Sequence, residues 1–143
     1  LNDNFSYIFK PSDIYEPILE LNLIKNKFLI DNIEINSFQH NHGSIDCTTY
    51  RIHDFAYSTD IKKFYSGTLN ELKGIKVWVI GCLRMDAHPS HASFKEIMDY
   101  IDFVKPERVY LTHLTGLMDY DKLNAISPKN TEPAFDGLEI NII

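Results

Sequence analysis

Residues 51–60 read RIHDFAYSTD, a short apolar run that ends at a carboxylate, Asp60. Residues 47–52 and 55–59 are rich in β-forming side chains, and only the dipeptide HD separates them. This pattern predicts a β-hairpin with a two-residue turn, because His and Asp tolerate the positive φ that such turns require. Asp60 is therefore expected at the end of a well-supported strand, where its side chain has a reproducible position.

Two histidines accompany Asp60 as candidate metal ligands. His42 lies upstream in QHNHG, and His113 ends the apolar run VYLTH. Zinc and manganese bind imidazole nitrogen and carboxylate oxygen at roughly 2.0–2.2 Å, and a carboxylate can bridge two ions about 3.5–4 Å apart. Spacing alone leaves open that the three are unrelated residues on a rim. His40 could also take the place of His42.

Residues 77–111 have the pattern strand, loop, helix, strand. The apolar runs 77–80 and 109–111 predict strands that are buried on both faces. Between them, an S-x-x-E capping box begins a helix whose apolar stripe covers residues 94–104. In such a unit the strands are parallel, and their carboxyl ends meet at the edge where ligands bind. His91 lies in the loop that leaves this edge.

Shorter elements are predicted on either side of the hairpin and of this unit. Alternating apolar residues predict strands at 18–24, 28–30, 33–38 and 138–142, and helical spacing predicts helices at 68–73 and 121–125. The dipeptide Asp31-Asn32 predicts a second two-residue turn. Residues 39–46 are polar and are predicted to form a loop that contains both His40 and His42.

Composition limits the classes of protein to consider. A chain of 143 residues with 44% hydrophobic residues can form one domain with a core, and it has no apolar run near the roughly 20 residues of a membrane span. The net charge of −6 makes a nucleic-acid partner unexpected. Cys47 and Cys82 are isolated, which favours a reducing, cytoplasmic location, with Cys82 in the core. Because the chain begins at Leu1 and its first methionine is Met85, a missing first part of a longer protein is one expectation.

The motifs HNHG, FAYSTD, HPSHASF, LTHL and FDGLEI occur in an order that resembles the metallo-β-lactamase superfamily, in particular its cyclic-phosphate phosphodiesterase branch. Together they cover most of residues 39–143. The resemblance implies an αββα sandwich with a two-metal site, containing zinc or manganese, on its rim. It implies His42, Asp60 and His113 as metal ligands, with Asp60 bridging the ions in catalysis. It also implies His91 as a catalytic proton donor beside the substrate, although His91 could instead form only local hydrogen bonds at a helix start.

Several family features are replaced in this sequence. The signature HxHxDH, which supplies the other metal ligands, does not occur, and Gly81 and Gly116 stand where relatives carry an aspartate and a second histidine. Residues 1–143 are therefore expected to form a single, partial α/β domain, the carboxyl-terminal part of the sandwich. The expected function is that of part of a metal-dependent phosphodiesterase for a small phosphodiester. Activity would require an amino-terminal fragment that carries HxHxDH, because three side chains cannot hold two ions in closed shells. The alternative is a non-catalytic remnant, or a fragment that binds one metal weakly.

A partial sandwich is also expected to expose apolar surface. The strand at 77–80 would be uncovered on one side, at a cost of about 25 cal/mol per Å² of apolar area. Exposed patches of this kind drive association. The isolated chain is therefore expected to dimerise, to aggregate, or to be stabilised by the amino-terminal fragment.

Overall fold

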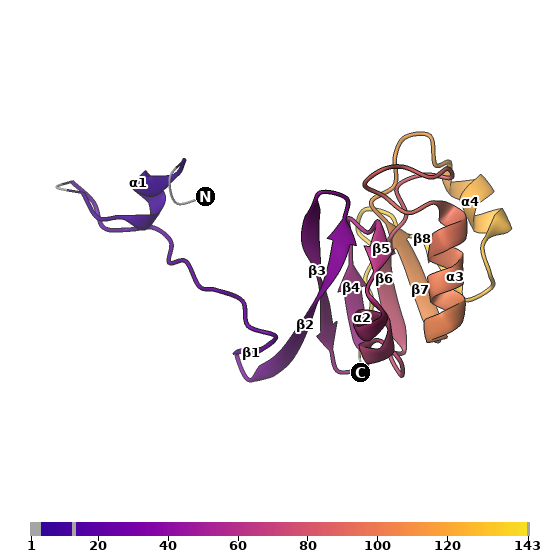
Figure 1. Cartoon of the computed structure of the whole chain (residues 1–143), viewed down its shortest axis with the longest axis horizontal. Helices are drawn as coiled ribbons and strands as arrows, with labels where there is room; N and C mark the ends of the chain where they lie inside the picture. Colours follow the sequence, from indigo (N-terminus) through magenta and orange to yellow (C-terminus); the bar gives the residue numbers. More distant parts are fainter. Residues whose placement is uncertain (1–3, 13, 143) are drawn as a thin grey trace.

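The computed structural model describes residues 4–12 and 14–142. Their strands form one mixed sheet in the order β1-β2-β3-β4-β6-β7-β8, and β5 pairs with β2. The strands are β1 (Lys27–Ile30), β2 (Ile33–His42), β3 (Ile45–Ile52), β4 (Phe55–Ser58), β5 (Lys63–Phe64), β6 (Val77–Gly81), β7 (Arg108–Thr112) and β8 (Thr131–Pro133). The helices are α1 (Ser6–Phe9), α2 (Ser66–Glu71), α3 (Phe94–Val104) and α4 (Tyr120–Ile126). Figure 1 shows the sheet with its helices, and a separate amino-terminal arm.

Three tight turns join the antiparallel strands β1 to β4. The predicted turns at Asp31-Asn32 and at the HD dipeptide are confirmed, with φ values of 46° and 69° for the first pair and 50° for His53. The loop predicted at 39–46 is wrong, because β2 continues to His42 and β3 begins at Ile45. The hydrogen bonds of the ladder join backbone groups, so polar side chains do not prevent strand formation. Only a turn at Gly43, where φ is +79°, separates the two strands.

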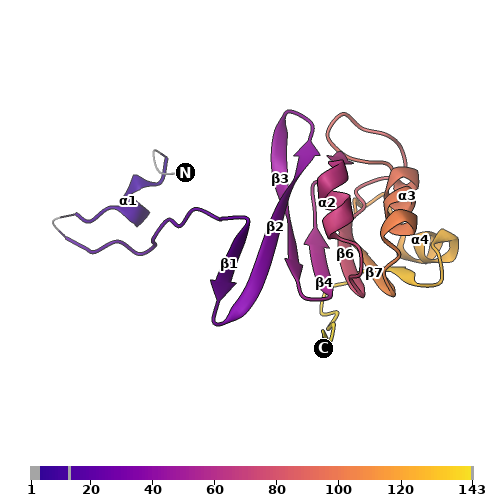
Figure 2. The same cartoon turned by 60° about the horizontal axis from the view of Figure 1, so that its bottom comes forward.

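β5 is antiparallel to β2, whereas β6, β7 and β8 pair in parallel, as the βαβ pattern predicts for β6 and β7. β6 pairs with β4 on one side and with β7 on the other, both in parallel register. Helix α3 connects β6 to β7, and its capping box has both reciprocal hydrogen bonds, between Ser93 and Glu96. Figure 2 shows α2 and α3 on the same face of the sheet. Under them lies the main core, built around fully buried side chains such as Trp78, Ile80 and Leu111.

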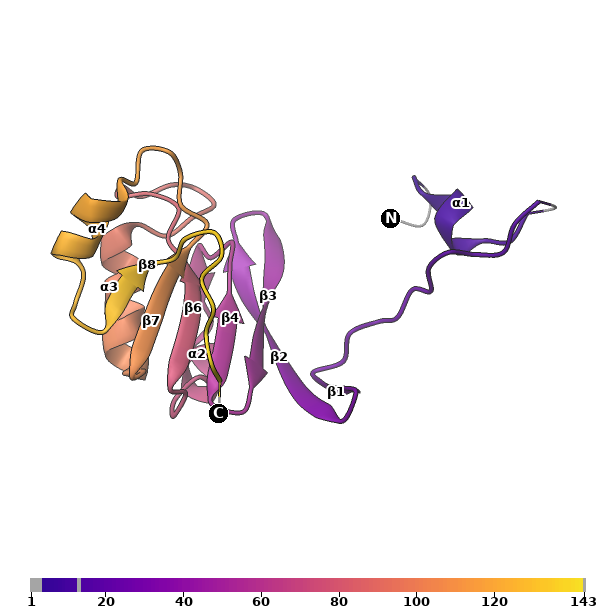
Figure 3. The same cartoon turned by 180° about the vertical axis from the view of Figure 1, so that it is seen from behind.

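The opposite face of the sheet is covered by the carboxyl-terminal segment. The strand predicted at 138–142 is wrong, because these residues run extended across the sheet without strand pairing, as Figure 3 shows from behind. Leu138 and Ile140 pack there against a cluster that contains Val77 and Val79. One-sided burial gives the same apolar alternation as a strand, which explains the error. The last strand is instead β8, and the expectation that residues 77–80 are uncovered on one side is also wrong.

The arm of residues 4–24, as far as it is described, lies apart from the sheet (Figure 1). The strand predicted at 18–24 is wrong, since a strand needs a neighbouring strand for its backbone hydrogen bonds. Among the described residues, only Ile18 and Leu19 of this segment make such bonds, both to the Ile8 carbonyl. Leu23 is 96% exposed, and Ile18 is 73% exposed. No helix in the described part of the chain is long and apolar enough to cross a membrane. Cys47 and Cys82 are both free thiols.

Candidate metal centre

The sheet topology brings Asp60, His42 and His113 to one edge. His42 is the last residue of β2, Asp60 follows β4 by two residues, and His113 directly follows β7. Because β2 and β4 are each antiparallel to β3, and β6 and β7 are parallel to β4, all these strands have their carboxyl ends at the same edge. His91 reaches the edge from the segment between β6 and α3. This is the edge where sheets with parallel strands bind ligands.

Asp60 and His113 share an unusual backbone conformation. Their φ values are +56° and +59°, in the left-handed region that costs a non-glycine residue about 1–2 kcal/mol. Each residue follows the end of a parallel strand, so the chain changes direction there. Gly81, at the end of β6, lies close to this turn, and a Cβ atom on it would lie 3.2 Å from the Cα atom of Thr59. A larger residue would therefore press on the backbone that presents Asp60.

Three imidazole rings converge on one carboxylate oxygen. The distance to Asp60 Oδ1 is 3.3 Å from His113 Nε2, 3.5 Å from His91 Nε2 and 3.8 Å from His42 Nε2. His91 and His42 are mostly buried, whereas Asp60 and His113 keep more than a third of their side-chain surface exposed. The group whose ligand atoms all lie within 4.8 Å of one another is His42, Asp60 and His91. The geometry thus adds His91 to the predicted ligands as a further side chain at ligand distance.

Ser90 determines which nitrogen of these rings carries the proton. His42 Nδ1 lies 2.8 Å from the Ser90 carbonyl oxygen, which can only accept, so Nδ1 is the protonated nitrogen. The Ser90 backbone N–H donates to His88 Nδ1 at 3.3 Å, so that nitrogen is an acceptor and the Ser90 hydroxyl, 3.0 Å away, donates to it as well. The hydroxyl oxygen then accepts from His91 Nδ1–H, also at 3.0 Å.

In their neutral forms, His42 and His91 therefore direct unprotonated Nε2 atoms toward the Asp60 carboxylate. His91 Nε2 is buried and has no hydrogen-bond partner. Two nitrogen lone pairs and a carboxylate facing one another repel unless a cation lies between them. Histidine nitrogen and carboxylate oxygen are the donors that zinc and manganese accept, and the second ring nitrogen of a ligand is normally held as it is here. The residues present thus fit a divalent metal ion.

Electrostatics favour the neutral form of His91. Burial lowers the pKa of its imidazole, and the neighbouring His42 lowers it further, against the opposing effect of the Asp60 carboxylate. A neutral ring suits a metal ligand. For a proton donor, the same lowered pKa is unfavourable, so that role would need a bound anion beside the ring. The predicted local hydrogen bond of His91 also exists, to Ser90.

His40 does not take the place of His42. Its side chain is fully buried, and both of its ring nitrogens have partners, with Nε2 2.9 Å from the Thr59 carbonyl oxygen and Nδ1 3.0 Å from the Thr49 hydroxyl. Burial lowers the pKa of His40, so the ring is neutral in the core. Sequence reasoning did not identify Ser90 or this environment of His40. The only local signal was the position of Ser90 between two histidines in HPSH.

The two glycines that replace family residues differ in their surroundings. Gly81 is packed against the Thr59–Asp60 backbone, so a side chain there would require this backbone to shift by a few tenths of an ångström. Gly116 is open, since a Cβ atom there would meet no atom within 4 Å. Only the first replacement is therefore coupled to the geometry of the site.

A mixed sheet with helices on one face, and with histidines and an aspartate at the ends of its strands, is typical of α/β proteins of the metallo-β-lactamase type. The chain belongs to the family described as the β-lactamase superfamily domain, whose model matches residues 1–114. The predicted superfamily is therefore confirmed, and so is the predicted fold class.

Individual proteins of similar fold or sequence agree with this family assignment. A diphosphatase from the PhnP family has a crystal structure that superposes with a TM-score of 0.86 at 22% identity, over 96% of this chain and 51% of its own. The metallo-β-lactamase fold protein YhfI from Bacillus subtilis gives a TM-score of 0.70 at 14% identity, over 92% of this chain and 58% of its own. An octanoyltransferase from Porphyromonas gingivalis is 27% identical over 146 residues, which cover 97% of this chain and 29% of that protein. The chain thus spans about half, or less, of the proteins it matches.

Proposed function

We propose that this chain supplies part of a metal-dependent hydrolase site that cleaves a phosphoester bond in a small phosphodiester. The observation that carries the proposal is the convergence of three histidine Nε2 atoms on Asp60 Oδ1. The similarity to a PhnP-family diphosphatase supports a substrate with phosphorus–oxygen bonds. Acyl transfer is not carried over from the octanoyltransferase, because the shared region is 29% of that protein.

In this proposal, His42, Asp60 and His113 would hold zinc or manganese, and the Asp60 carboxylate would serve as a ligand for both ions. When bound, such ions polarise a phosphoryl oxygen and lower the pKa of a water molecule. Ser90 keeps the rings of His42 and His91 in the tautomers that leave Nε2 free. His91 lies beside the substrate and gives a proton to the leaving oxygen once a phosphate anion has restored the charged form of its ring.

A second candidate is a site for one metal ion without catalysis. The specific observation in its favour is that, in the described part of the chain, His42, Asp60 and His91 form a set of three whose ligand atoms lie within 4.8 Å of one another, enough for a single ion. In that arrangement His91 is a ligand, and the exposed His113 lies outside the set. The two candidates thus assign different roles to His91 and to His113.

Metal titration of the His91→Ala and His113→Ala variants separates the candidates. Isothermal calorimetry with zinc gives the affinity and stoichiometry of each variant. Under the hydrolase proposal, His113→Ala weakens binding about tenfold or more, while His91→Ala changes the affinity little. The opposite result supports the single-ion site. A wild-type chain that binds no zinc at all contradicts both candidates.

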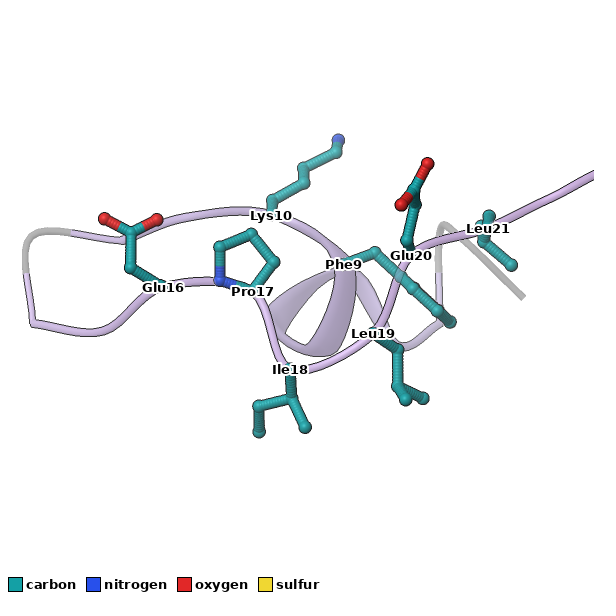
Figure 4. A pocket seen from close by; sticks show the side chains of 8 residues that line it. All are labelled: Phe9, Lys10, Glu16, Pro17, Ile18, Leu19, Glu20 and Leu21. Carbon is teal, nitrogen blue, oxygen red and sulfur yellow. The ribbon is translucent and has the colours of Figure 1, made fainter. Parts of the chain in front are cut away.

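We propose further that the remaining ligands come from a polypeptide segment carrying HxHxDH, and that the chain alone has no appreciable activity. The apolar arm supports such a partner. A pocket of about 700 Å³ on the arm is lined by residues that include Phe9, Leu19 and Leu21 (Figure 4). This surface and the exposed Leu23 could pack against another polypeptide.

Activity is tested with bis(p-nitrophenyl) phosphate, zinc or manganese, and the chain with or without the amino-terminal half of a metallo-β-lactamase-fold phosphodiesterase. The expected result is turnover only in the mixture, abolished by Asp60→Asn. Turnover by the chain alone that is lost in Asp60→Asn would show that no further ligand segment is needed. A mixture that binds two ions and has no activity would contradict the hydrolase proposal.

A further inference from the structure

Four fully buried polar side chains lie next to one another, each on a different strand. His40 is on β2, Thr49 on β3, Ser58 on β4 and Trp78 on β6, and their exposed fractions are all 0%. These strands are neighbours in the sheet. Buried polar groups are costly unless they are hydrogen-bonded, so their arrangement requires an explanation.

Hydrogen bonds join the four side chains in series. Trp78 Nε1 donates to Ser58 Oγ at 3.1 Å, and the hydroxyl oxygens of Ser58 and Thr49 lie 3.0 Å apart. Thr49 Oγ1 lies 3.0 Å from His40 Nδ1, and His40 Nε2 lies 2.9 Å from the Thr59 carbonyl oxygen. The series thus begins at an indole in the core and ends at the backbone next to Asp60.

Only one direction of donation satisfies the whole series. The Thr59 carbonyl can only accept, so His40 Nε2 carries the proton and Nδ1 of the neutral ring accepts. Thr49 must then donate its single hydroxyl proton to Nδ1, and the proton between the two hydroxyls comes from Ser58. Ser58 in turn accepts from Trp78, which is a donor only. Every proton has one acceptor, so the orientation of the His40 ring is determined.

The last bond of the series acts on the peptide that joins Thr59 to Asp60. Asp60 has a φ of +56°, a conformation that persists only where the surroundings enforce it. Gly81 approaches the same peptide from β6, with its Cβ position 3.5 Å from Asp60 N. The peptide is therefore held by a hydrogen bond on its carbonyl and by close packing. The side chain of Asp60, which follows this peptide directly, carries Oδ1, the atom on which the three histidines converge.

We propose that His40 is a positioning residue, which holds the Thr59–Asp60 peptide and so directs the Asp60 carboxylate toward the metal site. The buried series from Trp78 through Ser58 and Thr49 orients the His40 ring for this bond. The inference rests on the proposed function only in taking the Asp60 carboxylate as a metal ligand. His40 itself does not contact the ion.

Three variants of the full chain isolate the bond to Thr59. His40→Gln places an amide N–H near the position of Nε2 and should keep the bond. His40→Leu removes it but leaves the Thr49 hydroxyl buried without its acceptor. The double variant His40→Leu/Thr49→Val removes both partners of the bond between these two residues, and the buried hydroxyl that then lacks an acceptor is that of Ser58. Trp78→Phe is the matched control, because it removes a buried donor at the other end of the same series.

The first measurement is titration with cobalt(II), followed by its visible absorption. The expected result is that the double variant binds cobalt about 10- to 100-fold more weakly than wild type, the range for loss of a group that orients a ligand. His40→Gln should recover most of the affinity, and the Trp78→Phe control should lose less than the double variant. Wild-type affinity in a folded double variant would overturn the proposal.

The second measurement needs no metal. The Cα, Cβ and carbonyl ¹³C shifts of Asp60 report its backbone conformation by NMR. We expect the left-handed signature in wild type and in His40→Gln, and its loss in the double variant. Unchanged Asp60 shifts in the double variant would overturn the role of His40. A wild-type chain with the left-handed signature that binds no cobalt would instead contradict the proposed function and leave the positioning role intact.

Discussion

At the carboxyl edge of the sheet, several single residues act mainly by orienting the side chains of the candidate metal site. Ser90 illustrates this, because its carbonyl group holds His42 and its hydroxyl group holds both His88 and His91. Gly43 packs directly on it, since a Cβ atom there would lie 3.3 Å from Ser90 Cα and from Ser90 Cβ. The turn between β2 and β3 and the loop before α3 thus meet at one serine.

We predict that Ser90→Ala releases the His91 ring from its fixed tautomer, because His91 Nδ1–H loses its acceptor. Zinc affinity should change little, because the Ser90 carbonyl that holds the ligand His42 remains and His91 is not a ligand in the hydrolase proposal. Calorimetric titration with zinc measures the affinity, and ¹⁵N shifts of the His91 ring report the tautomer. Ser127→Ala is the control, since it removes a serine bonded to the Leu123 carbonyl, away from the site. A His91 ring that keeps its wild-type tautomer in a folded Ser90→Ala chain would contradict the orienting role.

The two cysteines should differ in reactivity toward a thiol reagent such as DTNB. Burial raises the pKa of Cys82 to about 12, so at pH 8 only about one thiol in ten thousand is the reactive thiolate. Burial also raises the pKa of Cys47, but its side chain is partly exposed. We expect Cys47 to react first and Cys82 to react only on unfolding. Fast labelling of one thiol in the native Cys47→Ser variant would contradict this.

Among the elements, α3 has the clearest local determinant. Ser93 Oγ accepts from the Glu96 backbone N–H, and the Glu96 carboxylate accepts from Ser93 N–H and from Ser93 Oγ–H at 2.8 Å. The N-cap, Ser93, follows His91 by two residues, so the start of the helix also determines where that ring is placed. The last turn ends at Val104, with Lys105 in the left-handed conformation.

We predict that Ser93→Ala lowers the free energy of unfolding by about 1 kcal/mol, the usual cost of losing an N-cap side chain. Urea denaturation measures the change. Lys95→Ala is the control on the same helix, because it removes only the exposed pair with Asp99 and should cost about 0.5 kcal/mol or less. An equal loss in both variants would argue against a specific contribution of the cap.

The contribution of the capping box to the free energy of unfolding should also depend on pH. Hydrogen bonds from Ser93 lower the pKa of Glu96 below its ordinary value of 4.5. A lowered pKa in the folded state stabilises the fold above the ordinary value, and this contribution is lost as the pH falls through the lowered pKa. We therefore expect the stability difference between wild type and Glu96→Gln to be constant near neutral pH and to shrink below about pH 4.5. A difference that grows on acidification would contradict this.

At the scale of the whole molecule, the sheet and the arm differ in burial. Both faces of β6 and of its neighbours in the sheet are covered, by α2 and α3 on one side and by the carboxyl-terminal segment on the other (Figures 2 and 3). β1 lies outside this cover and exposes Leu29. The arm instead exposes apolar side chains, with Ile14 at 90% and Leu23 at 96%. The expected apolar surface thus exists, but it lies on the arm and not on β6.

We predict that the chain self-associates through the arm, and that Ile14→Lys/Leu23→Lys shifts the population toward monomer, because charged side chains oppose burial of this surface. Sedimentation velocity over a concentration series measures the distribution. The control is Leu117→Lys, which replaces a leucine that is 89% exposed outside the arm. Association that is equally sensitive to the control, or a monomer at all concentrations, would contradict a role of the arm.

Short-range interactions determined the features that the sequence alone could predict. The turns at residues 31–32 and 53–54 and the capping box of α3 each depend on residues close together in the chain. The βαβ unit follows from the order of strand, helix and strand, because such a crossover leaves its two strands parallel. The order of the family motifs, together with the strand ends, also indicated Asp60, His42 and His113 before any distance was known. Their roles as ligands stay a prediction, whereas their proximity is now a geometric fact.

Other features depend on which distant segment of the chain packs or pairs against a given residue, and only the tertiary structure decided these. An alternating apolar run can pair as a strand, cover a sheet face or remain exposed, which is why residues 18–24 and 138–142 were predicted wrongly. The hydrogen bonds of Ser90 to His42, and of His40 to the peptide before Asp60, join residues 48 and 19 positions apart. Such contacts depend on strand register, and a serine or a buried histidine gives no local signal of them.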